Sequence, residues 1–405
     1  MHYDIVIIGA GPAGLGFGAL AAEQGFRVAV FDRQQENALA QPKNDGRDIA
    51  ISEKSRRILE GMGAWAHIPA KDISPIRAAK VLDGHAPFAL NFDPARTGAD
   101  RLGQIISNHL IRKALYKVAR VKAGLTLFAG CEVKALHRQA GHVELVLSDG
   151  RVMTGALAVA ADTRFSKIRR EAGIKAQQHD FGQTMIVGRM YCGVPHHHIA
   201  WEMFRYDGGL AVLPLNHDMA SIVQTFPAEK ADTYMAMSDA DYAAASAARL
   251  GHLLGALQIK SPRVAYPLVG VYAQKFYDHR LVLIGDAAVG MHPVTAHGFN
   301  FGIQGVADLA RRLAGANDPG LSPALSAWAR THRRRTWPLY QFTEKLIGLY
   351  TTNTLPARIA RKAGLHLAEH AGPAKDLLMA KLTGTPAPAL LIQHLPKPPF
   401  SLPGL

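Results

Sequence analysis

The stretch that decides the fold is YDIVIIGAGPAGLGFGALAAEQGFRVAVFD, residues 3–32. Its apolar run Tyr3–Ile8 predicts a buried strand, and after a glycine-rich turn residues 12–24 have the composition of a helix. Gly25 stands where the glycine that ends a helix belongs, and Arg27–Phe31 predicts a second strand. A strand, a helix and a strand in this order predict the first unit of a parallel α/β sheet.

The turn between this strand and helix fits the pattern G-x-G-x-x-G. In such turns the first glycine permits the tight turn, the second lets a pyrophosphate approach the backbone, and the third lets helix and strand pack closely. The helix start offers N–H donors to phosphates, and an acid after the second strand accepts hydrogen bonds from ribose hydroxyls. The pattern alone does not distinguish FAD from NAD. The residues that it predicts to bind a cofactor are Gly9, Gly11, Pro12, Ala13, Gly14, Asp32 and Arg33.

The composition is that of a soluble globular protein with two or three domains. The chain has 405 residues, of which 48% are hydrophobic and 19% charged. Two cysteines, Cys131 and Cys192, are too few for a disulfide framework and favour a reducing compartment. No signal peptide is expected at the start, and no apolar run approaches the roughly 20 residues of a membrane-spanning helix. We therefore expect a cytoplasmic protein.

Positive charge is concentrated towards the end of the chain. The net charge is +14, and residues 330–405 contain eleven Lys or Arg against three Asp or Glu. Arg333–Arg335 precede a run of aromatic and aliphatic residues from Trp337 to Tyr350. Two interpretations remain open: a surface that meets the membrane or an acidic partner, and a helix packed on the protein with its arginines in water. No nucleic-acid partner is expected, because no recognised binding module is present.

The remaining pattern alternates between helical, strand-like and antiparallel segments. The expected elements are helices over 50–66 and 103–122, a hairpin of 132–136 and 142–148, a strand over 156–161, an antiparallel sheet over 183–226, a short parallel strand over 281–284, a helix over 298–314, and a helical C-terminal third broken at Pro338, Pro356 and Pro373 and ending in a proline-rich tail from Pro386 to Pro403.

Two further motifs follow the glycine turn in a fixed order. The first is DTRFSKIR at 162–169, and the second is GDAA at 285–288, followed by HP at 292–293 and AHGFNFG at 296–302. Together the three motifs resemble the single-component FAD-dependent aromatic hydroxylases typified by p-hydroxybenzoate hydroxylase. The resemblance covers nearly the whole chain.

Within that group the chain is most similar to the ubiquinone-biosynthesis hydroxylases. The stretches GRDIAIS at 46–52, LGQII at 102–106 and GLAVLPL at 209–215 resemble theirs, and the variant motifs ADTRFS and HPVTAHG look most like the UbiM type. The resemblance implies an α/β fold with three parts. These are a Rossmann-like FAD-binding domain of residues 1–72, 101–180 and 276–330, an inserted antiparallel-sheet substrate domain of residues 73–100 and 181–275, and a helical C-terminal region of residues 331–405.

The resemblance also implies where FAD binds. Asp286 would contact the ribityl or ribose hydroxyls, and the segment 293–300 would pass along the flavin ring. Arg47 and Gln104 would reach the phosphates or the ribityl chain, and Asp162 would serve both FAD and a transient NAD(P)H. The residues implied are Arg47, Gln104, Asp162, Gly285, Asp286, Pro293, Gly298, Phe299 and Asn300. The chain departs from the usual motifs at Thr163, Val289, His297 and Gly305, which stand where Gly, His, Gln and Asp are common.

The implied reaction is hydroxylation of the aromatic ring of a prenylated phenol or quinone precursor in ubiquinone biosynthesis. NAD(P)H would reduce FAD, and dioxygen would form a C4a-hydroperoxide that delivers the hydroxyl group. His297 is a candidate general base and equally an ordinary pocket-lining residue. Glu202, Phe204, Leu213 and Pro214 are candidate substrate residues and equally plain strand residues. The run His196–His198 is not expected to bind a metal, because adjacent strand residues alternate sides.

Other functions on the same fold stay open. One is a related monooxygenase or reductase for another aromatic or isoprenoid substrate, and another is a non-catalytic carrier of prenyl groups. For a prenylated substrate we expect peripheral contact with the inner membrane face or with other ubiquinone-biosynthesis proteins. The oligomeric state is left open.

Overall fold

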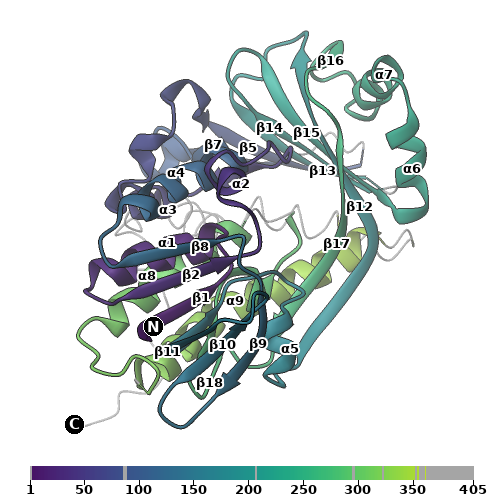
Figure 1. The fold of residues 1–405 in the computed structure, drawn as a ribbon. Coiled ribbons are helices and arrows are strands. Elements are labelled where there is room, and N and C mark those ends of the chain that lie inside the picture. Colours follow the sequence, from purple (N-terminus) through teal and green to yellow (C-terminus); the bar gives the residue numbers. More distant parts are fainter. Residues whose placement is uncertain are drawn as a thin grey trace, which may run out of the picture.

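The computed structural model describes residues 2–84, 89–205, 208–293, 297–321, 323–351, 354 and 361. Its first layer is an eight-stranded sheet, and the two strands on either side of the glycine turn and its helix run parallel in it (Figure 1). The strand order is β18-β19-β11-β1-β2-β8, with β10 paired to β11 and β9 to β10. The strands are β1 (His2–Ile8), β2 (Val28–Asp32), β8 (Leu125–Ala129), β9 (Val133–Arg138), β10 (Val143–Leu147), β11 (Val152–Ala160), β18 (Tyr277–Asp278) and β19 (Leu281–Leu283).

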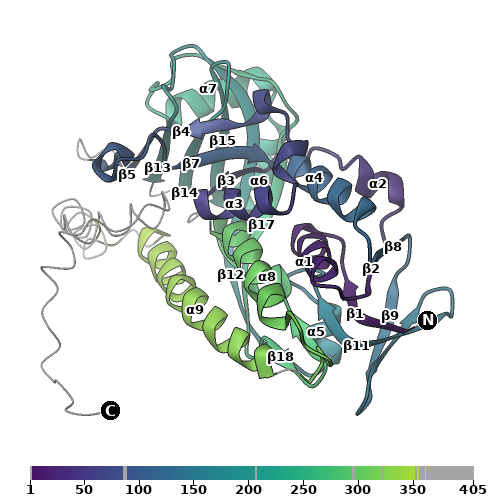
Figure 2. The ribbon, with the colours of Figure 1, turned by 90° about the vertical axis from the view of Figure 1, so that its left-hand side faces the viewer.

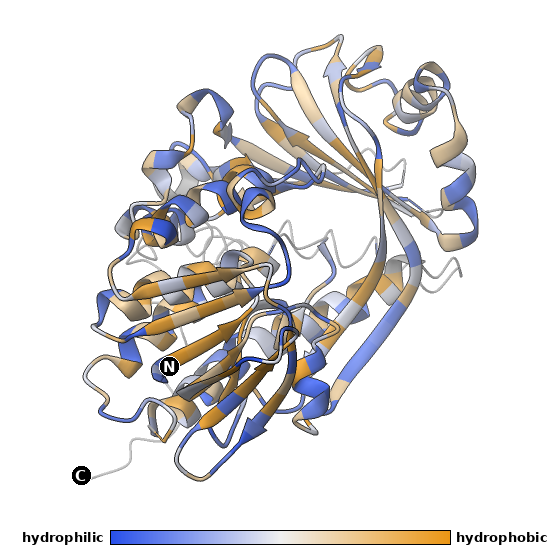
Figure 3. Cartoon of the chain, viewed as in Figure 1, coloured by the Kyte–Doolittle hydropathy of each residue, from blue (hydrophilic) through white to orange (hydrophobic). Residues whose placement is uncertain are grey.

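The apolar runs of this sheet are its buried core. Ile5, Val6 and Ile7 of β1 are fully buried, and Figure 3 shows hydrophobic residues along the central strands. Strands buried on both faces are nearly continuously apolar, which is why periodicity identified them. The predicted β1, α1 (Pro12–Glu23), β2 and β9–β10 hairpin are confirmed, as are the short parallel strand β19 and α8 (Gly298–Leu313).

Helices cover this sheet in a packed group. Helix α1 packs against α4 (Asn108–Val121) and α8, and α8 packs in turn against α9 (Pro323–Thr351), as Figure 2 shows. The shorter helices are α2 (Glu36–Ala40), α3 (Glu53–Gly61) and α5 (Lys167–Glu171), with 3-10 turns at Trp65–His67, Ala70–Asp72, Pro94–Thr97 and Gly285–Ala287. Among the described residues, no helix is both long enough and apolar enough to span a membrane.

The second layer is the expected antiparallel sheet, and it has nine strands. Its order is β20-β17-β12-β15-β14-β13-β5-β6, with β16 on β12, and β5 alone runs parallel to its neighbour β13. Helices α6 (Ala228–Ala236) and α7 (Asp239–Arg249) cover its outer face (Figure 1). The strands are β5 (Ala78–Asp83), β6 (Ala89–Phe92), β12 (Ala176–Cys192), β13 (Ile199–Arg205), β14 (Gly208–Pro214), β15 (Met219–Pro227), β16 (Leu257–Ile259), β17 (Val264–Ala273) and β20 (Val289–Gly290).

The long strands β12 and β17 run from the first layer into the second. They pair from Ala176↔Ala273 to Val187↔Val264, with a register shift between Asp180 and Thr184. The domain boundary proposed between residues 180 and 181 therefore falls inside β12, beside this irregularity. The division into domains itself remains a prediction.

Two predicted helices were wrong at their starts. Residues 48–51 form β3 (Asp48–Ile51) and residues 103–107 form β7 (Gly103–Ser107), which pair with each other and with β4 (Ser74–Ile76) in a small sheet. Helices α3 and α4 begin only after these strands. The physical reason is that a short apolar run suits a strand or a helix equally, and here pairing between segments distant in sequence decides it.

Helix α9 contradicts the break predicted at Pro338, which lies inside it. Proline removes one backbone hydrogen bond from the helix. Burial of Tyr340 and Ile347 on the far side of that position accompanies the continuous helix. Packing therefore outweighs the local preference. Pro356, Pro373 and the proline-rich tail lie outside the described residues.

Candidate cofactor and substrate site

The glycine turn packs backbone against backbone at two of its three glycines. Gly9 has φ +111°, and a Cβ there would lie 2.4 Å from the Ala161 carbonyl oxygen. A Cβ on Gly14 would lie 1.9 Å from the carbonyl oxygen of Gly9. At Gly11 no atom of the described chain comes within 4 Å of such a Cβ, and no side chain caps α1 there. The turn therefore leaves open space and free helix amides where a pyrophosphate would approach.

Asp32 is fixed at the end of β2. Its Oδ2 accepts a hydrogen bond of 2.7 Å from the Ala10 amide, and its Oδ1 accepts one of 2.8 Å from the Gln34 amide. A carboxylate has about four acceptor sites, so each oxygen can still accept from a ribose hydroxyl. Arg33 is exposed beside it.

Asp162 follows β11, next to the glycine turn. Its Oδ2 accepts from the Lys167 amide at 3.0 Å, whereas its buried Oδ1 has no hydrogen-bond partner among the residues that the structure describes. A buried acceptor without a partner is rare in a folded protein and indicates a missing donor. Thr163 has a φ that is not positive, so its backbone needs no glycine here. Its Oγ1 accepts a hydrogen bond of 3.2 Å from the Phe165 amide. The usual glycine is therefore not required at this position.

The turn of Gly285 and Asp286, called the GD turn below, packs against the start of α1. Gly285 has φ +55°, and a Cβ there would lie 2.8 Å from the Cβ of Ala13. The Asp286 side chain is 49% exposed and forms an ion pair of 3.2 Å with Arg164, which also donates to the Val269 carbonyl at 2.9 Å. The three sequence motifs thus meet at the carboxyl ends of β1, β11 and β19, where open α/β sheets bind their ligands.

The start of α8 faces the same region. Gly298 has open space at its Cβ position as far as the described chain extends, whereas Asn300 is buried. The Asn300 side chain donates to the Ala50 carbonyl at 2.8 Å and accepts from the Ser52 amide at 3.0 Å. It therefore ties α8 to the end of β3. Phe299 packs against the main core, and Pro293 is exposed beside residues 294–296, which lie outside the described chain.

His297 stands at the amino end of α8. Its ring centroid is 5.5 Å from that of Phe301, and it is partly buried. The geometry agrees equally with a pocket-lining side chain and with a base, so its catalytic role remains a prediction.

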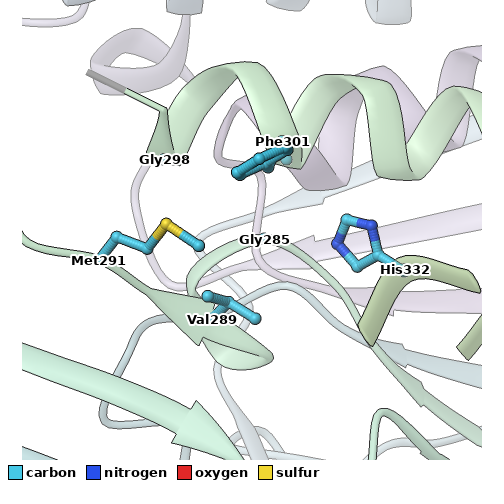
Figure 4. A pocket seen from close by; sticks show the side chains of 7 residues that line it. Gly285, Val289, Met291, Gly298, Phe301 and His332 are labelled. Carbon is cyan, nitrogen blue, oxygen red and sulfur yellow. The ribbon is translucent and has the colours of Figure 1, made fainter. Parts of the chain in front are cut away.

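A small cavity of about 10 Å³ lies behind the GD turn, between β20, α8 and α9 (Figure 4). This volume suits about one water molecule and not a flavin ring. His332 of α9 points into it, and burial, followed by the charge of Arg335, lowers the pKa of His332 to about 4. His332 is therefore neutral at pH 7. The other lining residues are Gly285, Val289, Met291, Gly298, Phe301 and Gly302.

His332 explains one departure from the usual motif. A Cβ on Gly305 would lie 2.6 Å from the His332 ring, so no side chain fits there. Glycine at position 305, where aspartate is common, was therefore a sign in the sequence that a bulky ring packs there. The sequence did not identify that ring as His332.

Arg47 is held by a residue that the sequence did not single out. Its guanidinium donates to Asp45 Oδ2 at 2.6 and 3.0 Å and lies 5.6 Å above the Tyr266 ring. Asn108 donates to the same carboxylate oxygen at 2.7 Å. This fixes Arg47 at the edge of the nine-stranded sheet.

Gln104 lies in β7 beside a surface hollow of about 280 Å³. Its buried Oε1 has no hydrogen-bond partner among the described residues, which matches the unpaired oxygen of Asp162. The hollow is lined in addition by Glu53, Arg56, Arg57, Ala99, Asp100 and Arg101.

Three of the four predicted substrate residues share one sheet face. Glu202 and Phe204 alternate with Trp201 and Met203, which pack in the outer core under α6 and α7. Glu202 and Phe204 therefore point to the inner face, and Leu213 packs there against Leu102 and against Ile105 of β7. Pro214, one position later, falls on the outer face.

The histidine run 196–198 is a turn, not a strand. His197 and His198 have φ of 52° and 58°, and His196 Nδ1 accepts from the His198 amide at 3.0 Å. The strand expected at these three residues was therefore wrong, and so was the reason drawn from it that their side chains alternate between two sides. Within the described ranges, no cluster of three metal-binding side chains is found.

Comparison with known proteins agrees with this geometry. Residues 2–343 match the protein family described as FAD binding domain. Ubiquinone hydroxylase UbiM of Neisseria meningitidis is 38% identical over 95% of this chain and 85% of its own, and ubiquinone hydroxylase UbiL of Rhodospirillum rubrum is 33% identical over 97% and 93%.

Solved structures share the fold at lower identity. The p-nitrophenol 4-monooxygenase PnpA of Pseudomonas putida superposes with a TM-score of 0.75 at 17% identity, over 95% of this chain and 97% of that one. PqsL of P. aeruginosa gives 0.74 at 21% identity, over 87% and 97%. The expected fold class is thereby confirmed, and the chain belongs to the FAD-binding-domain family that includes these ubiquinone hydroxylases.

Proposed function

We propose that this protein is an FAD-dependent monooxygenase that uses NAD(P)H and dioxygen to hydroxylate the ring of a prenylated phenol in ubiquinone biosynthesis. The observation that carries the proposal is the meeting of the three motifs at the carboxyl ends of β1, β11 and β19, around open backbone at Gly11 and Gly298. The names of the two ubiquinone hydroxylases described above supply the substrate class.

The chain's own residues bind and orient the reactants. The amides at the start of α1 would bind the pyrophosphate, Asp32 the adenosine ribose, and Asp286 the hydroxyls nearer the ring. The unpaired oxygens of Asp162 and Gln104 are acceptors for ribose or ribityl hydroxyls. Bound FAD supplies the reductive activation of dioxygen. The inner face of the nine-stranded sheet would orient the phenol and exclude water.

The test is NAD(P)H oxidation by the purified yellow protein with a short-chain prenylated phenol. We expect oxidation coupled to hydroxylated product only when both phenol and dioxygen are present. Turnover without dioxygen would instead identify a reductase. A colourless protein that takes up no added FAD would favour the non-catalytic prenyl-group carrier.

We propose further that α9 contacts the membrane in which a prenylated substrate resides. Its inner side packs on the protein through Tyr340 and Ile347, whereas Trp337 is 40% and Phe342 56% exposed. The exposed basic residues around these two aromatics are Arg334, Arg335 and Lys345. Aromatic side chains beside cations suit the interface of an anionic bilayer. Arg333 does not take part, because it packs over Tyr272 and Phe276.

Replacing both exposed aromatics tests this contact. The double variant Trp337→Ser, Phe342→Ser should bind vesicles of anionic phospholipid at least about tenfold more weakly, since two large apolar side chains lose their burial. Val121→Ser is the control, because Val121 is 83% exposed on α4, away from α9. Equal sedimentation of all three proteins with vesicles would refute the contact.

A further inference from the structure

Glu202 is an acidic residue on the inner face of the nine-stranded sheet, and both of its cross-strand partners are apolar. It lies on β13 between Ala211 of β14 and Val81 of β5, with which it is in register. The inner-face neighbours along β13 are Ala200 and Phe204, and Ala200 packs in the cluster that joins this sheet to β7. A carboxyl group here lies on the face that packs toward β7 and not on the face covered by α6 and α7.

No residue that the structure describes hydrogen-bonds or ion-pairs with the Glu202 carboxyl group. The neighbouring strand contributes Gly209, whose absent Cβ would lie 3.9 Å from Glu202 Oε1, so no larger side chain covers the carboxyl from that side. Burial raises the pKa of Glu202 to about 8. The half-buried carboxyl group thus lies between apolar cross-strand neighbours and has no partner among the described residues.

Two charged residues on this face, Asp83 of β5 and Arg189 of β12, already have partners. Asp83, which lies beside Phe204 on β5, forms a buried ion pair of 3.9 Å with Arg361. Arg189 of β12 is bound to Asp48. Thr225 of β15 is the uncharged polar residue near Gly209. Burial is the cause of the raised pKa of Glu202, and no charged group among the described residues contributes to that rise.

An unpaired carboxyl group in apolar surroundings lowers stability, whereas glutamine or leucine would fit the same strand at less cost. Such groups are typical of functional sites, where a ligand provides the partner. The substrate class proposed above carries one ionisable group, its phenolic hydroxyl, and the remainder is apolar. A carboxyl group without a protein partner, next to the apolar Ala211 and Val81, complements that chemistry.

We infer that Glu202 is the catalytic base that accepts the phenolic proton of the substrate, an inference that rests on the proposed function. The O–H bond of the phenol breaks, its proton bonds to a carboxylate oxygen of Glu202, and the electron pair stays on the phenolate oxygen. The phenolate donates electron density to the ring carbons, which favours their attack on an electrophilic oxygen. Glu202 releases the proton to water when the product leaves.

The test compares Glu202→Gln with the wild-type holoenzyme and with Glu229→Gln, an exposed residue on α6. Glutamine keeps the shape of glutamate and cannot accept the proton. We expect unchanged FAD content and a kcat for hydroxylation at least about 100-fold lower in Glu202→Gln, and wild-type values in Glu229→Gln. Glu202→Asp should recover part of this loss.

The pH profile separates a base from a structural residue. Because a base acts when deprotonated, wild-type kcat/KM should rise as pH passes through about 8. In Glu202→Gln this rise should disappear, and activity should return only as the phenol ionises by itself, near pH 10 for a simple phenol. An unchanged kcat and pH profile in the variant would overturn the inference and leave the proposed function intact. A wild-type enzyme that hydroxylates no phenol would instead overturn the proposed function.

Discussion

Gly11→Ala should abolish FAD binding without destabilising the apoprotein, whereas Gly14→Ala should cause both defects. A Cβ on Gly11 enters space that is open within the described chain, where the pyrophosphate would approach. A Cβ on Gly14 would lie 1.9 Å from the Gly9 carbonyl oxygen, so the turn must move. For Gly11→Ala we expect FAD affinity to fall at least 100-fold, which corresponds to about 3 kcal/mol.

The measurements are FAD content by visible absorbance, titration of apoprotein with FAD, and thermal unfolding of each apoprotein. Gly61→Ala in α3 is the matched control, because a Cβ there meets no described atom within 4 Å and lies far from the turn in sequence. It should behave as wild type. A Gly14→Ala protein that is fully yellow and as stable as wild type would contradict the close packing described for this turn.

Arg189→Met should be strongly destabilising, because Arg189 joins the nine-stranded sheet to the small sheet of β3, β4 and β7. Arg189 on β12 binds Asp48 on β3 with hydrogen bonds of 3.1 and 2.6 Å, and it also contacts the Ser107 hydroxyl. The Asp48 side chain is fully buried. Loss of the arginine leaves a buried carboxylate without its counter-charge, which costs about 3–5 kcal/mol.

Denaturant unfolding measures this cost directly. The double variant Asp48→Asn, Arg189→Met should recover much of the loss, because the uncompensated charge is removed as well. Arg151→Met is the control, since Arg151 and Asp149 form an exposed pair whose loss should leave the free energy of unfolding nearly unchanged. If Arg189→Met and Arg151→Met lower the free energy of unfolding equally little, the Arg189–Asp48 pair does not stabilise the contact between the nine-stranded sheet and the small sheet.

Local signals predicted the first βαβ unit and the residues around it. The apolar strands, the glycine turn and Asp32 are encoded within 32 consecutive residues, so periodicity and turn chemistry were sufficient. Strands β3 and β7 were not predictable in the same way, because each is short and acquires its pairing from a segment about 50 residues away. Pro338 shows the same limit, since packing of α9 outweighs the local tendency of proline to end a helix.

The sequence predicted the motifs of the candidate site but not the side-chain contacts that link them. Asp162 and Asp286 were identified from sequence, whereas the Arg164–Asp286 ion pair that links their motifs depends on the fold. Asp45 and His332 gave no sequence signal of their own, because their roles come from contacts with Arg47 and with the space left by Gly305. The expected place of Asn300 at the cofactor stays a prediction, whereas the bridge that its side chain forms between α8 and β3 depends on the fold.

The most direct test of the central claim is the source of the oxygen atom in the product. The purified protein, with FAD, NAD(P)H and a prenylated phenol, is supplied with isotopically labelled dioxygen, and the product is analysed by mass spectrometry. We expect a ring-hydroxylated product that contains one labelled oxygen atom for each NAD(P)H consumed in coupled turnover. A product without the label, or NAD(P)H consumption with an unchanged phenol under every condition, would contradict it.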